Sequence, residues 1–163
     1  MATTTTPPSV AVDLAFLLDQ ASHALTTELA GALADLDITP RLWCVLSKAV
    51  GNDYTQNRLA EVCALDKTTM VVAIDELERA GFAERRPSAT DRRARIIVVT
   101  EAGRRVVAEA SRIVGGVYED VLSALPARER DALVGGLVRL VEGRLSTPVY
   151  PGPPVRRRAA RNP

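Results

Sequence analysis

The segment from Thr55 to Phe82, TQNRLAEVCALDKTTMVVAIDELERAGF, most constrains what this chain can fold into. Thr55 and Asp66 are residue types that cap helix N-termini, and each precedes a short stretch with apolar residues at helical spacing. Gly81 stands where a left-handed glycine commonly ends a helix. The segment therefore predicts two short helices joined tightly near residues 64–65, which is a helix-turn-helix.

The spacing of apolar residues predicts which faces of these two helices are buried. The inner face of the first helix is expected to carry Leu59, Val62 and Cys63. That of the second is expected to carry Met70, Ala73, Ile74 and Leu77. The outward positions of the second helix are then Lys67, Thr68, Thr69, Val71, Val72, Asp75, Glu76 and Arg79.

A strongly basic stretch, RRPSATDRRARIIVVT, follows from Arg85 to Thr100 and places five arginines within residues 85–95. Residues 82–86 and 95–99 are expected to pair as strands, with turn-forming residues between them. So much positive charge is tolerable only if the hairpin is well solvated or meets something negative. After a helix-turn-helix, the second interpretation is favoured, and the hairpin is expected to be the wing of a DNA-binding domain.

The charge of the whole chain hides this feature. Net charge is only +1 over 163 residues, yet residues 55–105 carry ten basic and eight acidic side chains. The stretch 146–163 has four arginines and no acidic residue. An argument from the isoelectric point alone would have missed a nucleic-acid partner.

Long amphipathic helices are predicted on both sides of the helix-turn-helix. The first runs from Leu14 to Leu36, and a second begins with Thr39 as its cap and Pro40 in its first turn. After the wing, Thr100 is expected to cap a long helix, and Pro126 is expected to begin the last one. The fold class is therefore mainly α with a small β wing.

The chain resembles the MarR-type transcriptional regulators. The resemblance rests on four pieces in family order: ITPRLWCVL (38–46), LAEVCALDKTTM (59–70), IDELERAGFAERR (74–86) and TDRRARIIVVTEAG (90–103). It implies a single domain over residues 11–145, with a winged helix-turn-helix at about 38–100 and dimerisation helices at about 11–36 and 101–145. Residues 1–10 are expected to be a disordered arm, and 146–163 a disordered, basic, proline-rich tail.

The resemblance also implies roles for individual residues in binding double-stranded DNA. Arg93 matches the wing-tip arginine that enters the minor groove, and Asp91 matches the acid that orients it. A narrow minor groove concentrates negative potential, which agrees with that role. The remaining basic candidates are expected to meet phosphates or, on the wing, their own acidic neighbours: Arg58, Arg85, Arg86, Arg92 and Arg95.

The start of the second helix is the expected recognition surface. Lys67, Thr68 and Thr69 suit contacts to phosphates or base edges. At Val71 and Val72, members of the family often have Thr and Arg. The two valines could touch thymine methyl groups, or Val71 could pack inward. Without an arginine there, we expect more reliance on the wing and on DNA shape than on guanine contacts.

The family typically releases DNA when a small molecule, often an aromatic acid, binds beside the dimer helices. The resemblance implies a dimeric repressor on a palindromic operator, with His23, Arg41 and Trp43 near such an effector. Arg41 could pair with a carboxylate and Trp43 could stack on a ring. The alternatives are an exposed His23, an Arg41 that bonds a helix end and a Trp43 that belongs to the core.

Cysteine-based redox sensing is an alternative function, because some family members sense oxidants through a cysteine near the start of the first helix. This chain has none there. Cys63 is expected to be inert core. Cys44 is expected to be more accessible, with Arg41 as its only basic neighbour close in sequence. A non-specific DNA-binding or helical interaction module is a further alternative.

An enzyme is not expected. A lone histidine leaves no Ser-His-Asp set and no multi-histidine metal site. The chain has no P-loop and no glycine-rich dinucleotide fingerprint, so no cofactor is expected. It lacks a signal-peptide pattern and an apolar run long enough to span a bilayer, which makes the cytoplasm the expected location.

Overall fold

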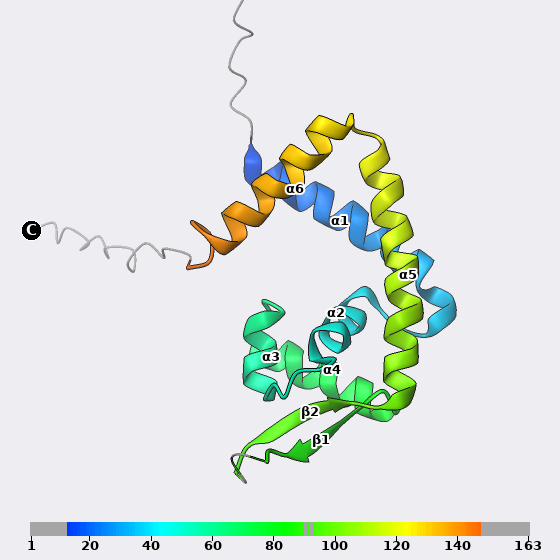
Figure 1. Ribbon diagram of the computed structural model, residues 1–163, viewed down its shortest axis with the longest axis vertical. Coiled ribbons are helices and arrows are strands. Elements are labelled where there is room, and N and C mark those ends of the chain that lie inside the picture. The colour runs from blue at the N-terminus through cyan, green and yellow to red at the C-terminus, as the bar shows by residue number, and fades with distance from the viewer. Residues whose placement is uncertain (1–12, 90, 92, 148–163) are drawn as a thin grey trace, which may run out of the picture. The chain divides into compact units, whose positions relative to one another are not determined.

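The structure is a computed structural model that describes residues 13–89, 91 and 93–147 (Figure 1). The chain divides into two units, Met1–Glu119 and Asp120–Pro163, and each is described by itself. The predicted arm, and the predicted tail beyond residue 147, lie outside the described residues. In chain order the elements are α1 (Leu14–Ala32), the 3-10 helix η1 (Ala34–Leu36), α2 (Pro40–Ala49), α3 (Gln56–Val62), α4 (Lys67–Arg79), β1 (Ala83–Pro87), β2 (Arg95–Val99), α5 (Glu101–Ser123) and α6 (Ala127–Glu142).

Side-chain caps begin the helices of the winged domain where the sequence predicts them. Thr39, Thr55 and Asp66 each accept a hydrogen bond from the backbone N–H three residues on. The Thr100 hydroxyl does the same for Gly103 at 3.0 Å. These bonds satisfy N–H groups that the first turn of a helix leaves without partners. The predicted mainly α fold with a two-stranded wing is confirmed.

The predicted first helix is shorter than its apolar pattern suggests. Helix α1 ends at Ala32, and a 3-10 turn with left-handed Asp37 (φ 49°) separates it from α2. The prediction of one helix from Leu14 to Leu36 is therefore wrong at its end. Its apolar spacing continues because Leu33 and Leu36 still face the core across the turn.

Buried side chains from α1 to α5 form the core of the first unit. The four predicted residues of α4 are all buried. In α3, Leu59 is buried as predicted, whereas Val62 and Cys63 are only half-buried. Ala60 is buried instead, because it faces the turn where the N–H of Leu65 bonds its carbonyl at 2.9 Å.

The wing is an antiparallel pair with register Ala83↔Val99 to Pro87↔Arg95. A third segment extends it: Thr55 forms a bridge with Ile96, and the N–H of Ile97 donates to the carbonyl of Tyr54 at 2.9 Å. The residue that caps α3 is thus also joined to β2. As a result, the first helix of the helix-turn-helix begins at a fixed place beside the wing.

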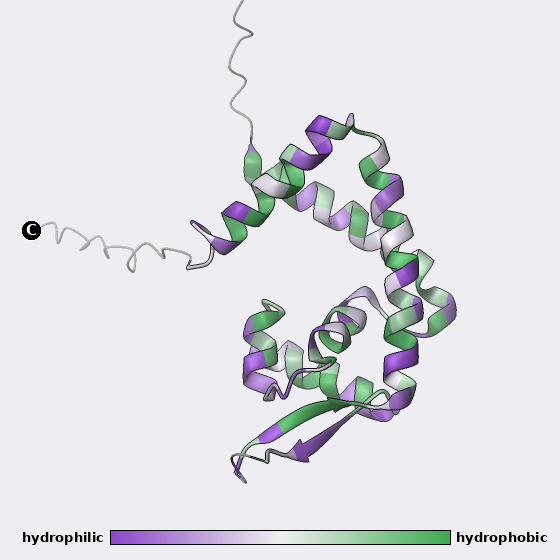
Figure 2. Ribbon diagram, in the orientation of Figure 1, coloured by the Kyte–Doolittle hydropathy of each residue, from purple (hydrophilic) through white to green (hydrophobic). Residues whose placement is uncertain are grey.

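Helices α1 and α6 each keep large apolar side chains exposed, and Figure 2 shows stretches of both helices in the colour of hydrophobic residues. On α1 they are Leu14, Phe16, Leu17 and Leu18, and in the second unit, on α6 and just after it, they are Leu133, Val134, Leu137, Val138, Leu140, Val141 and Leu145. No helix in the described part of the chain is long and apolar enough to cross a membrane.

Candidate nucleic-acid interface

Helix α4 presents its first turn to solvent. Lys67 and Thr68 are exposed there. Thr69 is held by the capping residue: its N–H donates to one carboxylate oxygen of Asp66 at 2.9 Å and its hydroxyl to the other at 2.5 Å. The bond from the Thr69 hydroxyl is the larger cause, and together the two bonds lower the pKa of Asp66. Thr69 therefore stabilises the start of the helix, and Lys67 and Thr68 are the freer groups.

Val71 and Val72 both face solvent, with 39% and 51% of their surface exposed. The alternative in which Val71 packs inward is wrong. Met70, Ala73 and Ile74 already fill the inner face of α4, which leaves the valines on the outer one. Two branched apolar side chains thus stand in the middle of the recognition surface, next to Lys67 and Thr68.

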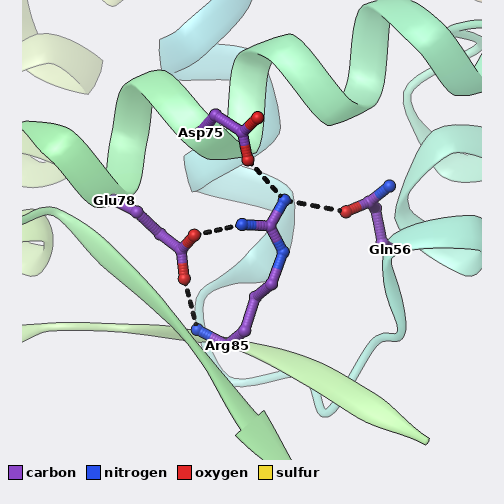
Figure 3. Close-up of polar contacts among 4 residues, drawn as sticks. All are labelled: Gln56, Asp75, Glu78 and Arg85. Atoms are coloured by element: carbon purple, nitrogen blue, oxygen red, sulfur yellow. Dashed lines mark hydrogen bonds and ion pairs between the residues drawn. The ribbon is translucent and has the colours of Figure 1, made fainter.

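Arg85 on β1 is enclosed by groups from two helices (Figure 3). Its guanidinium pairs with Glu78, lies 2.7 Å from an oxygen of Asp75 and donates to the side-chain oxygen of Gln56 at 3.1 Å. Its backbone N–H also donates to Glu78 at 2.8 Å. Of the two roles predicted for Arg85, the pairing with acidic neighbours is the one present in the structure.

Two further predicted DNA contacts also have acidic partners. Arg86 pairs with Glu84 on the same strand. Arg58 pairs with Glu61 one turn along α3 at 2.8 Å, and both side chains are well exposed. Exposed pairs of this kind contribute little to stability, so these arginines can exchange their partner for a phosphate at small cost.

The wing turn is built around Asp91. Its carboxylate accepts the backbone N–H of Arg93 at 2.9 Å, and its carbonyl accepts the N–H of Ala94 at 3.0 Å. The acid thus fixes the backbone of the turn from which Arg93 projects. Arg92, another predicted contact, lies outside the described residues.

Three predicted cations remain without an acidic partner among the described residues: Lys67, Arg93 and Arg95. Lys67 begins α4, and the two arginines belong to the wing turn and the start of β2. All three are exposed. They are the groups whose charge is most available to an anionic partner.

A hollow of about 390 Å³ lies between the start of α3 and the wing. Its lining comprises Thr55, Gln56, Asn57, Arg85, Ala94, Arg95 and Ile97. Gln56 and Asn57 were not among the sequence-predicted contacts. Their place in the first turn of a capped helix was the sequence feature that could have identified them. Their position beside the wing, however, depends on the pairing of Tyr54 and Thr55 with β2.

Comparisons with known proteins agree with this geometry. The MarR family model matches residues 36–94. The crystal structure of CouR from Rhodococcus jostii RHA1 bound to p-coumaroyl-CoA is similar with a TM-score of 0.74 and 25% identity, over 88% of this chain and 99% of that one. Residues 36–94 of this chain are thus similar to the MarR family.

Two further MarR-family structures are similar. The transcriptional repressor CouR bound to a 23-mer DNA duplex has a TM-score of 0.71 and 29% identity, over 78% of this chain and 92% of that one. Wild-type apo MarR from E. coli has a TM-score of 0.70 and 23% identity, over 80% and 98%. The matched family and the DNA-bound neighbour are transcriptional regulators rather than enzymes.

The chain also has an open cavity of about 490 Å³, lined from α1, α2, the α3–α4 turn and α5. Its lining comprises Ser22, Thr26, Leu29, Pro40, Arg41, Trp43, Cys44, Cys63, Leu65 and Tyr118. Arg41 and Trp43 both line this cavity. His23 is exposed on α1 and does not line the cavity.

Trp43 serves both the core and the cavity. Its ring packs against the core, and its indole N–H donates to the hydroxyl of Ser111 on α5 at 3.1 Å. Burial, followed by the nearby charge of Cys44, raises the pKa of Tyr118. The phenol of Tyr118 therefore stays protonated at neutral pH and remains a hydrogen-bond donor at the cavity wall.

The two cysteines are closer than the sequence suggested. Both are half-buried free thiols, and both line this cavity. A hydrogen bond from Cys63 lowers the pKa of Cys44 to about 6, burial opposes the shift, and Lys48 assists it. Cys63 packs against the core, and its raised pKa agrees with an unreactive thiol. The expectation that Arg41 is the only basic neighbour of Cys44 is wrong. Lys48, one helical turn along α2 from Cys44, was missed.

Proposed function

We propose that this chain is a dimeric repressor that places one winged helix-turn-helix on each half of a palindromic operator. The supporting observation is a set of three cations, Lys67, Arg93 and Arg95, that have no acidic partner in the part of the chain that the structure describes and lie at the start of α4 and on the wing. In winged-helix proteins these elements meet the major groove and the adjacent backbone or minor groove. The relative CouR was crystallised on a DNA duplex.

A dimer is supported by the apolar side chains that α1 and α6 leave exposed. Large contiguous apolar patches on a soluble chain commonly mark protein–protein contacts. Specific binding by a winged helix-turn-helix usually needs two copies, because one copy covers only a half-site. Sedimentation equilibrium is expected to give twice the chain mass, and Leu137→Glu with Val141→Glu is expected to give the monomer.

Release by a small aromatic or carboxylate effector is supported by the cavity that Arg41 and Trp43 line. Arg41 also lines a second hollow, together with Thr68 and Val72 of the recognition surface. A carboxylate that drew Arg41 into the first cavity would remove this side chain from beside α4. That shared position is a physical route from effector to DNA.

The effector proposal can be tested by fluorescence, because Trp43 is the only tryptophan. Titration with aromatic carboxylates and their thioesters is expected to change its emission and to release DNA. Arg41→Ala should weaken the binding of carboxylates at least tenfold, and His23→Ala should leave their affinity unchanged. An emission change without DNA release would contradict the effector role.

The repressor proposal is tested by a band shift with DNA flanking the chain's own gene, titrated against unrelated competitor. Wild type is expected to bind in the presence of competitor, and Arg93→Ala is expected to lose most of that affinity. Arg112→Ala is the matched control, because it removes one exposed, paired arginine of α5. Equal loss in both variants, or binding that competitor abolishes, would contradict a specific wing contact.

A further inference from the structure

The side-chain amide of Gln56 is held in one orientation by Arg85 (Figure 3). The Nη2 nitrogen of Arg85 donates to the amide oxygen of Gln56 at 3.1 Å and to an oxygen of Asp75 at 2.7 Å. A guanidinium has donors and no acceptor, so it can meet only the oxygen end of an amide. The amide nitrogen of Gln56 therefore faces away from Arg85, and it has no acceptor among the described residues.

Gln56 and Arg95 line the same hollow of about 390 Å³ between α3 and the wing. Arg85 lines it too, but its charge is already balanced by Glu78 and Asp75. Arg95 is exposed and has no acidic partner in the part of the chain that the structure describes. The hollow therefore offers two kinds of donor, a neutral amide from α3 and a charged guanidinium from the wing.

These donors select the chemical class of the partner. A glutamine reads adenine by using its amide nitrogen and its amide oxygen together. Arg85 already holds the oxygen of Gln56, so the nitrogen is the end that is left for a ligand. A donor amide beside an unpaired guanidinium suits an oxygen that is negatively charged and only accepts hydrogen bonds. The DNA backbone presents such oxygens at every phosphate.

We propose that this hollow binds one phosphate of the DNA backbone, with Gln56 as the neutral donor and Arg95 as the charged donor. Arg85 is then a positioning residue, because it fixes the direction of the Gln56 amide without touching DNA. The proposal rests on the proposed function, since it needs the wing to lie along DNA. A phosphate contact sets the register of the protein on the duplex and carries no sequence information. Gln56 therefore governs how α3 and the wing lie on the backbone, and not which bases are read.

Two substitutions at Gln56 separate its contact with DNA from its contact with Arg85. Gln56→Glu keeps an oxygen for Arg85 but replaces the donor by a negative charge. Its urea midpoint is expected to stay unchanged or rise, while its DNA affinity falls at least tenfold. Gln56→Leu is neutral and has neither donor nor acceptor, and its DNA affinity is expected to fall about tenfold.

The affinities are measured with the full chain on the DNA flanking its own gene and on an unrelated duplex of the same length at low salt. Gln56→Leu is expected to weaken both by the same factor, because every duplex has phosphates. It should leave the steepness of the plot of log binding constant against log salt concentration unchanged, whereas Arg95→Ala should decrease it by about one. In Arg85→Ala, which no longer holds the amide, Gln56→Leu is expected to cost less than twofold.

The phosphate itself is located with duplexes that carry a single neutral methylphosphonate linkage. Wild type is expected to lose affinity at one linkage in each half of the operator. Gln56→Leu should lose at least twofold less there, because both changes remove the same contact. Equal sensitivity of the two proteins at every linkage would overturn the phosphate contact.

The remaining outcomes separate this contact from the proposed function. Wild-type affinity in Gln56→Leu would overturn the contact even if Gln56→Glu is weakened, because long-range charge would then explain the weaker variant. A loss confined to the operator would also overturn it, since that pattern indicates base readout. An unchanged tenfold cost in Arg85→Ala would overturn the positioning role. If wild type prefers no operator, the proposed function fails, while the unrelated duplex still decides the contact of Gln56.

Discussion

Glu78 on the recognition helix accepts the backbone N–H of Arg85 at 2.8 Å and pairs with the guanidinium of the same residue. Both side chains are less than one third exposed, so this contact is less screened than the surface pairs of the wing. It joins α4 to β1, and Asp75 and Gln56 extend it along α4 and to α3. The contact therefore fixes the wing relative to the recognition helix.

Arg85→Ala is expected to lower the free energy of unfolding by about 2 kcal/mol, because the acids of α4 lose a shared partner. A double-mutant cycle with Glu78→Gln should give a coupling energy of about 1 kcal/mol by urea denaturation. The salt dependence of DNA binding should not change in Arg85→Ala. A decrease of about one in the steepness of the plot of log binding constant against log salt concentration would instead show that Arg85 contacts a phosphate.

Gly103 is expected to tolerate no side chain. A Cβ there would lie 2.1 Å from the carbonyl oxygen of Phe82 and 2.8 Å from a methyl carbon of Val99. Gly103→Ala should therefore lower the free energy of unfolding by at least about 2 kcal/mol, as expected for overpacking against backbone. Thermal denaturation at fixed protein concentration measures the change.

Gly116 supplies the matched control for Gly103, since it lies in the same helix and nothing lies within 4 Å of its Cβ position. Gly116→Ala should raise stability by up to about 1 kcal/mol through helix propensity. Equal destabilisation by both substitutions would mean that the close approach to Phe82 is not what Gly103 permits.

Local chemistry made much of the fold predictable. Caps such as Asp66, the left-handed Gly81 and the spacing of Thr100 and Gly103 depend on residues at most a few positions apart. The cysteine pair and the partners of Arg85 depend on how α2, α3 and β1 pack. Sequence could identify Arg85 as a cation, but which anion it meets is decided by tertiary structure.

Val71 and Val72 are expected to give this protein little guanine preference beneath the middle of α4. Exposed branched side chains offer methyl contacts and no hydrogen bonds, so they suit thymine. Selection of operators from a random library should return A·T-rich positions there, with Val72→Arg shifting one position toward guanine. Strong guanine dependence in wild type would contradict direct readout by the valines.

Cys44 is expected to react with neutral alkylating agents at a rate that levels off near neutral pH. Because its pKa is lowered to about 6, the thiolate predominates above that pH, and further alkali adds little nucleophile. An ordinary thiol would gain rate up to about pH 9. Stopped-flow alkylation with iodoacetamide, followed by peptide mapping, measures the profile.

Cys63→Ala removes the largest cause of the pKa shift of Cys44 and should move the midpoint upward. Lys48→Ala removes a lesser cause and should move it less. A wild-type midpoint above pH 8 would mean that burial outweighs the hydrogen bond from Cys63.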